Sequence, residues 1–523
     1  MKNKKHTITA AASLLFVGGL LLTGCSTPVA SAGISSSTST STESATAVAL
    51  DTGTVAAEVL AANANSTTVN DDEWTSDGAV SITLAGSTAS ADDTGVVVDG
   101  TTVTITAAGT YVLSGQLDGQ VVVDTADEGV VALVLDGVQI SSSTSAAIAV
   151  LNAEDVAVSL SGSSNLTSIG ADDDANAALF SDADLTISGD GSLAVTSDAN
   201  DGITSLDDLV VLSGDITVTA ADDGLRGKDS LTVEGGTVTV NAGGDALKSD
   251  NAEDDTRGYV HIAGGTIDLV AGDDGVQAQT DLVITGGATT VSATDDGLKA
   301  EVHLVVAGGT TSVDTSYEGL EAFYVTIEGG TLDVHASDDG INATSGTSTT
   351  TDVGGRVEAD DGAMVAITGG ESTINSEGDG IDSNGSILVT GGATTVFGSP
   401  EDREGALDTN GSLIVTSGTV LAVGTTGMAT SPDAESEQGW LSASLEQTYG
   451  AGESVQVLDD SGTVVAEFTS VKSFQSVVLS AAALVEGSTY TVTVDGQTAG
   501  TVTAGVAAAG GMEGGLGGPP ARG

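Results

Sequence analysis

A repeat of about 22 residues is the feature that most constrains the fold of this 523-residue chain. Within it, a Gly-Gly pair alternates with an acidic residue placed directly before a glycine, as in SYEGLEAFYVTIEGGTLDVHASDDGINAT, residues 316–344. The acidic-turn glycines Gly275, Gly297, Gly319 and Gly340 are spaced by 22, 22 and 21 residues. A period of this length, with short β-rich runs and no helical periodicity, predicts a solenoid.

Apolar residues alternate on both sides of each Gly-Gly pair, which indicates strands with one buried face. The runs before the pair contain Leu231/Val233, Val260/Ile262, Leu282/Ile284, Leu304/Val306, Val325/Ile327 and Val365/Ile367. The runs after it contain Val238/Val240, Ile267/Leu269 and Leu332/Val334. A third, very short run after the acidic turn begins with Leu225, Leu247, Val276, Leu298, Leu320, Ile341 and Ile381. The expected fold class is therefore all-β: a parallel β-helix with three strands per ~22-residue coil and glycine at two corners, which often need φ > 0.

Composition and periodicity divide the chain into segments. The expected segments are a signal peptide at 1–25, a Ser/Thr-rich tether at 26–50, the β-helix at 74–430 with irregular first coils to about 180, a small C-terminal β cap at 431–505 and a Gly-rich disordered tail at 506–523. Insertions at about 249–258 and 343–362 break the period and should loop out near the third strand.

The first residues are typical of an export signal. Lys2, Lys4 and Lys5 precede an apolar stretch, Ala10–Leu22, that is too short to span a bilayer. The sequence Leu-Thr-Gly-Cys that ends at Cys25 resembles the bacterial lipobox, in which the cysteine is lipidated. Because Cys25 is the only cysteine, no intrachain disulfide can form. The protein is expected to be exported, attached to the cell membrane or surface through this lipid alone, and monomeric.

The charge is strongly acidic, with 74 Asp and Glu against 12 Lys and Arg. Three of the basic residues precede Cys25, so the processed chain would carry 12 − 3 = 9 bases. Such a surface argues against binding DNA or RNA, which needs basic groups. It permits cation binding, but solubility or adaptation to salt explains it equally well.

The acidic turns should form a ladder, because equivalent positions on successive coils lie about 4.8 Å apart. We call this set the acidic ladder: Asp222, Asp223, Asp245, Asp273, Asp274, Asp295, Asp296, Glu318, Asp338, Asp339 and Asp379. Two carboxylates at that spacing repel by roughly 1 kcal/mol in water and about 3–4 kcal/mol at an effective dielectric near 20. Calcium, which takes six to eight oxygen ligands, is the expected cofactor. For any single Asp-Gly, turn capping by the Asp side chain is the simpler explanation, whereas the Asp-Asp doubling favours a metal.

A basic column stands beside the ladder. Arg226, Lys248 and Lys299 follow the first apolar residue of the third strand, where later coils have Glu321 and Asn342. These three bases either balance the neighbouring aspartates, contact anionic sugar groups, or act as a Brønsted base toward a uronate. None of the four histidines, His6, His261, His303 and His335, lies in a Gly-His-Gly sequence, which argues against polygalacturonase-type hydrolysis. His261, His303 and His335 are expected at the solvated surface.

Several stretches closely resemble a family of bacterial exported carbohydrate-binding β-helix proteins, in a lipoprotein form. They are residues 316–344, DDGLRGKDSLTVEGGTVTV, GDALKSDN, YVHIAGGTIDLVAGDDGVQAQTDLVITGG and DGTTVTITAAGTYVLSGQLDGQVVVD. The resemblance runs from about Trp74 to Tyr490 and implies a right-handed parallel β-helix with bound calcium, similar in shape to pectate lyases but not established as catalytic. The family's characterised clostridial member binds polygalacturonate and cellulosic material. This chain departs from the family in its acidity and its long insertion at 343–362, which leaves ligand preference open.

Three functions compete. The first, which we favour, is non-catalytic, calcium-dependent binding of acidic polysaccharide of the pectin or polygalacturonate type. The second is a calcium-dependent polyuronate lyase with Lys248, Lys299 or Arg226 as base, although the basic and aromatic motifs of familiar pectate lyases are missing. The third is a structural or adhesive spacer, which the scarcity of tryptophan fits, since Trp74 and Trp440 are the only two.

Overall fold

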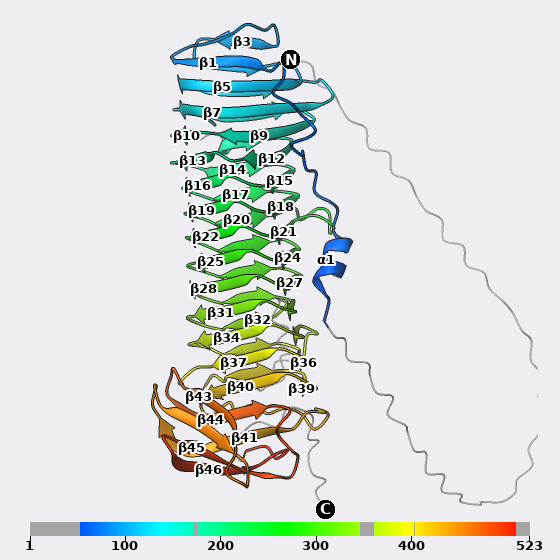
Figure 1. Ribbon diagram of the computed structural model, residues 1–523, viewed down its shortest axis with the longest axis vertical. Helices are drawn as coiled ribbons and strands as arrows, with labels where there is room; N and C mark the ends of the chain where they lie inside the picture. The colour runs from blue at the N-terminus through cyan, green and yellow to red at the C-terminus, as the bar shows by residue number, and fades with distance from the viewer. Residues whose placement is uncertain (1–52, 171–174, 346–359, 402, 509–523) are drawn as a thin grey trace, which may run out of the picture. The chain divides into compact units, whose positions relative to one another are not determined.

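The computed structural model describes residues 53–170, 175–345, 360–401 and 403–508, and almost all of its regular structure is β-strand (Figure 1). The signal peptide, the tether, most of the 343–362 insertion and residues 509–523 lie outside the described residues. Within the described part, no helix combines the length and the apolar character that crossing a bilayer requires.

Each repeat contributes two strands to a 28-stranded sheet and one to a 14-stranded sheet. In the larger sheet, one stack of parallel strands precedes the Gly-Gly corner, and we call it the first stack: β9(Asp155–Ser161), β12(Asp184–Gly189), β15(Asp208–Val211), β18(Ser230–Val233), β21(Tyr259–Ile262), β24(Asp281–Ile284), β27(His303–Val306), β30(Tyr324–Ile327), β33(Met364–Ile367), β36(Ser386–Val389) and β39(Leu413–Val415). The second stack follows that corner: β10(Ser163–Ser168), β13(Ser192–Ser197), β16(Asp215–Ala220), β19(Thr237–Ala242), β22(Thr266–Ala271), β25(Ala288–Ser292), β28(Thr310–Ser316), β31(Thr331–Ala336), β34(Glu371–Ser376), β37(Ala393–Phe397) and β40(Thr419–Gly424).

The 14-stranded sheet, here called the short-strand sheet, follows the acidic turn. Its strands are β3(Val96–Asp99), β4(Thr102–Ile105), β6(Gln120–Asp124), β8(Ile148–Asn152), β11(Ala177–Ser181), β14(Asp201–Ser205), β17(Leu225–Gly227), β20(Leu247–Ser249), β23(Val276–Ala278), β26(Leu298–Ala300), β29(Leu320–Ala322), β32(Ile341–Ala343), β35(Ile381–Ser383) and β38(Leu407–Thr409). The long parallel sheets and the β-helix-like fold expected from the repeat are thus confirmed.

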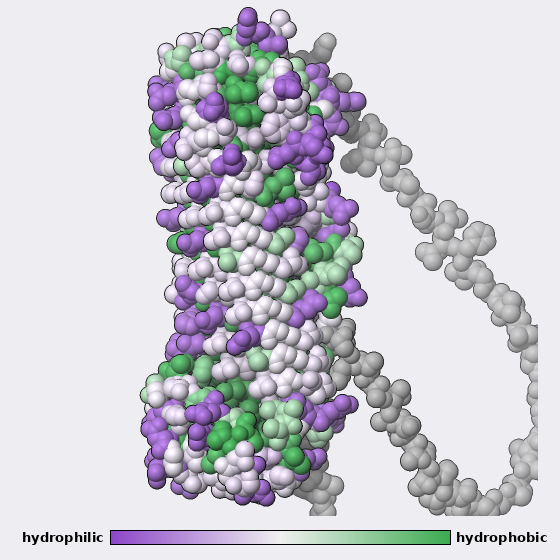
Figure 2. Space-filling view, in the orientation of Figure 1, coloured by the Kyte–Doolittle hydropathy of each residue, from purple (hydrophilic) through white to green (hydrophobic). Residues whose placement is uncertain are grey.

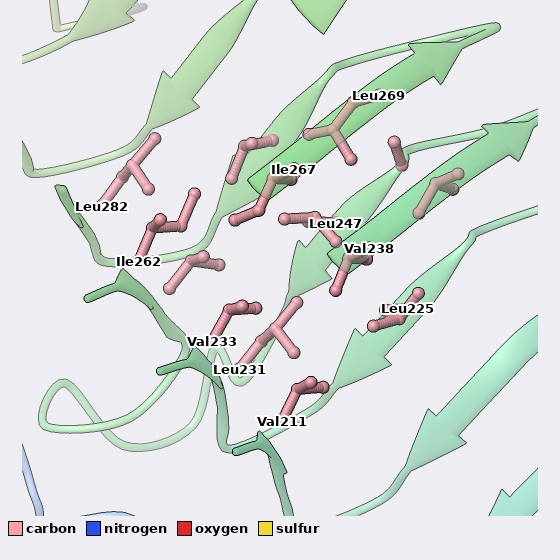
Figure 3. Packing of buried hydrophobic residues seen from close by; sticks show 14 of the residues in the cluster. Val211, Leu225, Leu231, Val233, Val238, Leu247, Ile262, Ile267, Leu269 and Leu282 are labelled. Atoms are coloured by element: carbon pink, nitrogen blue, oxygen red, sulfur yellow. The ribbon is translucent and has the colours of Figure 1, made fainter. Parts of the chain in front are cut away.

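Register keeps equivalent residues aligned from coil to coil. Leu231 pairs with Val260, which pairs with Leu282, so the apolar positions stack in columns. Leu225, Leu231 and Val238, one from each set of strands, are all fully buried and belong to one continuous core (Figure 3). Since the coil interior is narrow, the Val, Leu and Ile of this sequence fill it in thin layers without large aromatics.

The two glycine corners have different causes. In the Gly-Gly pair the second residue has positive φ, for example +78° at Gly309, which is accessible at little cost only to glycine. The expectation of positive φ is wrong for the acidic corner, where Gly297 is not among the positive-φ residues. There a Cβ would lie 2.5 Å from Val313 Cγ1 and 2.7 Å from the Gly319 carbonyl oxygen, so close packing between coils excludes a side chain.

The two ends of the strand stack differ from the repeats. At the N-terminal end, the strands β1(Val80–Gly86), β2(Ala89–Ala91), β5(Gly109–Asp118) and β7(Val130–Ser142) are longer or antiparallel, and β7 pairs with both β9 and β10. At the C-terminal end, β44(Phe474–Ser480) pairs antiparallel with β40 and with β41(Trp440–Tyr449). A separate antiparallel sheet contains β42(Ser454–Leu458), β43(Val464–Thr469), β45(Thr489–Val494) and β46(Gln497–Thr503).

An N-terminal strap, residues 53–76, lies along the outer face of the first stack and was not anticipated from the sequence (Figure 1). Its single helix, α1(Ala56–Ala62), packs Val59 against outward-facing Val283 and Val305. In Figure 2 the surface of this helix is largely apolar. Further along the strap, the Val69 amide donates to Thr186 Oγ1 at 3.0 Å. The strap therefore buries an apolar sheet face that would otherwise be open to solvent.

Candidate functional site: the acidic ladder

The acidic ladder occupies the corner between the second stack and the short-strand sheet. The inner acid of a coil, such as Asp274 or Asp296, precedes the corner residue, which is glycine in all of these coils except the one with Ala246. Most inner acids are buried, but Glu318 and Asp339 are half-buried. A second, outer aspartate precedes Asp223, Asp274, Asp296 and Asp339. The outer Asp222 and Asp273 are exposed. Because the corner glycine has no side chain, adjacent coils can pack closely at this corner, and the inner carboxylates lie one above another.

The inner carboxylates bind the backbone of the next coil. The Asp223 Oδ1 accepts the Asp245 amide at 2.9 Å, Asp245 Oδ1 accepts the Asp274 amide at 2.9 Å, and Asp274 Oδ1 accepts the Asp296 amide at 2.9 Å. A buried amide without a partner is costly, so each link stabilises the stacking of two coils. One oxygen each of Asp223, Asp245 and Asp274 is thus committed to the fold, and the second remains for a cation.

Glu318 differs from the aspartates of the ladder. Its two carboxylate oxygens accept from Asn342 Nδ2 at 3.0 and 2.9 Å. Beyond it the amide links resume, with Asp339 Oδ1 accepting the Asp379 amide at 2.6 Å and Asp379 accepting the Gly405 amide.

The basic column supplies cations to the second oxygens. Lys248 Nζ lies 2.7 Å from Asp245 Oδ2 and 3.1 Å from Asp223 Oδ2, so one ammonium bridges two coils. Lys299 Nζ lies 2.5 Å from Asp296 Oδ2 and 4.0 Å from Asp274 Oδ2. In the structure these two lysines therefore balance the charge of the neighbouring aspartates, which is one of the three roles considered for the basic column.

Arg226 completes the set. Its Nη2 lies 2.7 Å from Oδ2 of Asp250, a residue of the first insertion, and its Nη1 lies 3.9 Å from Asp201 Oδ2. That insertion does loop out between β20 and β21, as its position in the repeat predicts. The side chains of Arg226, Lys248 and Lys299 are only 19–25% exposed, which limits their contact with a bound glycan.

Burial sets the protonation of the ladder. It raises the pKa of Asp274 to about 7, although the Asp296 amide and Lys299 partly oppose it. Burial likewise raises the pKa of Glu318 to about 8 against the effect of Asn342. For Lys248, burial would lower the pKa, but the hydrogen bond to Asp245 and the charge of Asp223 raise it well above the ordinary lysine value.

The cationic compensation stops before the C-terminal end of the ladder. Among the described residues, no Lys, Arg or His forms an ion pair with Asp339 or Asp379. Burial raises the pKa of Asp379 to about 9, and the charges of Asp339, Asp408 and Asp382 add to this despite the Gly405 amide. This end of the ladder therefore has the strongest electrostatic demand for an added cation.

Acidic side chains also group into triplets whose ligand atoms lie within 4.8 Å of one another. Four triplets contain members of the ladder: Asp201/Asp222/Asp223, Asp245/Asp273/Asp274, Asp274/Asp295/Asp296 and Asp296/Glu318/Glu321. An oxygen-only donor set suits calcium, so these residues fit the ion, although Lys248 and Lys299 compete for some of the oxygens. Asp338, Asp339 and Asp379 join no such triplet among the described residues.

Comparison with known proteins identifies the family. A family model described as carbohydrate-binding domain-containing protein matches residues 99–362, which is 264 of the 523 residues. The chain belongs to this carbohydrate-binding family. The matched range contains the acidic ladder from Asp222 to Asp339 and the whole basic column.

No curated protein matches this chain significantly. Among solved structures, the chain is similar to the polysaccharide lyase-like protein from C. thermocellum, solved as a gadolinium derivative, with 30% sequence identity and a TM-score of 0.38. That alignment covers 49% of this chain and 93% of the other.

Sequence reasoning missed several polar groups of this carbohydrate-binding protein. Glu321 joins a triplet and lies 3.3 Å from Lys299, and Asn342 holds Glu318, although both had been noted only as replacements in the basic column. A fifth triplet, Asp184/Asp207/Asp208, lies at the other end of the short strands, where Asp208 binds Arg257 at 3.0 Å. The signal that could have revealed it is a second acidic pair, Asp207-Asp208, outside the Asp-Gly pattern.

Two of the histidines are less exposed than expected. His303 Nδ1 lies 2.8 Å from Asp281 Oδ1 and its side chain is 22% exposed. Burial lowers the pKa of His261, whose Nε2 lies 3.0 Å from Thr285 Oγ1. His335 is solvated as expected, with a side chain that is 54% exposed.

Proposed function

We propose that this protein is a non-catalytic, calcium-dependent binder of acidic, uronate-rich polysaccharide at the cell surface. The observation that carries the proposal is the repetition of carboxylate triplets along one corner of a chain that belongs to a carbohydrate-binding family. A polyanionic protein would repel a polyanionic glycan, so the two need a shared divalent cation.

The roles of the residues follow from their positions. Calcium, when bound, would supply positive charge and coordination sites that protein and uronate oxygens can share. The inner aspartates hold the coils in register through their Oδ1 atoms, which fixes the spacing of the remaining oxygens. The exposed Asp222 and Asp273 complete triplets at the surface, where a polysaccharide can reach them. Asp339 and Asp379, which have no ion-pair partner among the described residues, would take a cation where the basic column ends.

The architecture in this proposal is a right-handed parallel β-helix with three strands per coil. Parallel crossover connections are overwhelmingly right-handed, which supports the handedness. The protein would act as an exported monomer, attached to the membrane through lipid on Cys25.

A lyase remains the less favoured activity. The pKa of Lys248 and that of Lys299 are raised by neighbouring carboxylates, so both amines hold their protons at neutral pH. A Brønsted base for abstraction at a uronate must instead be deprotonated when the substrate binds. Arg226 has the same difficulty, because a guanidinium keeps its proton. Unsaturated uronate formed by the wild type and lost in Lys248→Ala or Lys299→Ala would support a lyase after all.

A spacer role is favoured by one specific observation: the inner aspartates are engaged in links between coils, so the ladder serves the fold even without a glycan. This alternative predicts calcium-dependent stability without polysaccharide binding.

Co-sedimentation of the protein with acid-insoluble polygalacturonate tests the proposal. We expect retention in calcium and loss of retention in excess chelator. Retention that is indifferent to the chelator would remove calcium from the account, and no retention in either condition would leave another glycan or the spacer role.

A further inference from the structure

One coil of the strand stack carries a cluster of three aromatic residues, one exposed and two half-buried. The chain has only six Tyr, six Phe and two Trp, yet Tyr317, Phe323 and Tyr324 fall within eight residues. Tyr317 is 48% exposed, whereas Tyr259, in an earlier coil, is only 4% exposed. Core packing accounts in part for Phe323, which packs against the continuous core, but not for the solvent-facing ring of Tyr317.

Tyr317 lies on the outer side of the acidic ladder. Its amide donates to the Asp295 carbonyl at 2.7 Å, and its carbonyl accepts the Asp338 amide at 2.9 Å, so the ring replaces an outer aspartate between those two coils. The phenol lies beside the carboxylate of Asp338, a group that accepts hydrogen bonds.

A second aromatic surface lies at the opposite end of the same short strand, β29. The rings of Phe323 and Tyr324 meet edge to face at a centroid distance of 4.5 Å, and His303 stacks on Tyr324 at 5.3 Å. His303 is held in turn by Asp281. These half-buried rings are fixed by one another, so binding a ligand would cost little side-chain entropy.

Polar groups lie between the two aromatic ends. Glu321 points outward from β29, beside Lys299 on one neighbouring coil and Asn342 on the other. The six residue steps from Tyr317 to Phe323 span at most ~20 Å along the chain. Flat rings that flank a strip of acceptors match a sugar chain, whose units have an apolar C–H face and a hydroxyl-bearing rim.

We propose that this coil is a sugar-ring binding surface, with Tyr317 at one end of β29 and Phe323, Tyr324 and His303 at the other. Its occupant is a pyranose chain of the polysaccharide class named above, and the inference rests on that proposed function. The rings pack against the C–H faces of the sugar units. Charge complementarity orients the occupant, because Asp338, which joins no triplet among the described residues, repels a uronate carboxylate but accepts hydrogen bonds from hydroxyl groups.

Binding to polygalacturonate in calcium, measured by affinity electrophoresis, tests the surface with matched variants. Tyr317→Ala should weaken binding about two- to twelvefold, the range typical of an aromatic contact. Tyr317→Phe should retain the affinity, because the ring remains. Phe323→Leu should weaken binding, because the side chain keeps its apolar character but loses the flat ring. Tyr449→Ala, outside this coil, is the aromatic control and should leave the affinity unchanged.

The outcomes separate this inference from the function on which it rests. If Tyr317→Ala and Phe323→Leu bind like the wild type while chelation abolishes binding, the aromatic surface is refuted and the calcium-dependent function stands. If the aromatic variants weaken binding but chelation does not, the surface stands and the role of calcium falls. If the wild type binds no polygalacturonate at all, both proposals fail. An unchanged melting temperature for Tyr317→Ala excludes misfolding as the cause of lost binding.

Discussion

Lys248→Met removes the ammonium that bridges two coils of the acidic ladder. Lys248 Nζ contacts Asp245 at 2.7 Å and Asp223 at 3.1 Å, and these carboxylate side chains are only 5% and 9% exposed. Breaking a buried ion pair by removing one partner typically costs about 3–5 kcal/mol. Because a quarter of the lysine side chain is exposed and screened, we expect the free energy of unfolding to fall by about 2–4 kcal/mol at pH 8.

The penalty of this substitution should depend on pH. In the wild type, burial raises the pKa of Asp223 above its value in the unfolded chain, and the positive charge of Lys248 opposes that shift. Without the lysine, the folded state therefore binds a proton more tightly than the unfolded chain, and its stability is lost as pH rises. Lowering the pH to 5 should thus reduce the penalty, since protonation relieves the unpaired carboxylates.

Urea unfolding at pH 5 and pH 8, followed by circular dichroism, measures both effects. Lys228→Met is the matched control, because Lys228 lies in the adjacent coil and forms no ion pair with the described residues. The reasoning is refuted if Lys248→Met costs no more than the control at pH 8, or if its penalty is the same at both pH values.

Three further predictions concern the ladder, the coil corner and the strap. In calcium-free buffer, the melting temperature should fall as the pH rises from about 4 to about 9, because the folded pKa values of Asp274, Glu318 and Asp379 are raised to about 7, 8 and 9; calorimetry with calcium should show a flatter dependence. Gly309→Ala should lower the unfolding free energy by about 1–3 kcal/mol, because φ is +78° and the new Cβ would lie 2.5 Å from a carbonyl oxygen; an unchanged urea midpoint would contradict this. Val59→Asp should release the strap, since Val59 is 2% exposed; limited proteolysis should then cut residues 53–76 faster than in the wild type, and equal rates would show that α1 is not held by this contact.

The sequence predicts the stacked strands because their signal is local and repeated. Alternation at Leu231/Val233 and its equivalents marks the buried face, and the 22-residue period aligns one coil with the next. The strap could not be predicted in this way, because its contacts join residues far apart in the chain. Val59, for example, packs against Val283 and Val305.

The sequence predicts where the acidic residues of the candidate site lie, but not which hydrogen bonds their carboxylates form. The period places Asp245 beside Asp274, but only the structure shows that one oxygen of each carboxylate binds the next backbone amide. Gly297 is required because a side chain there would clash with Val313 and with the adjacent coil. Local backbone preferences, which are all that the sequence pattern reports, do not reveal this contact. Tyr317 was quoted in the repeat, yet its exposure between acidic turns emerges only when coils are stacked.

The central claim is tested most directly by removing charge from the outer acids of the triplets. Asp273→Asn/Asp295→Asn neutralises two of them, whereas Asp215→Asn/Asp268→Asn makes the same charge change on the second stack, away from the ladder. We would measure retention of both variants on acid-insoluble polygalacturonate in calcium. The account predicts that the first variant loses retention while the second keeps it. Equal retention of the two would contradict the claim that cations at the acidic ladder bind the polysaccharide.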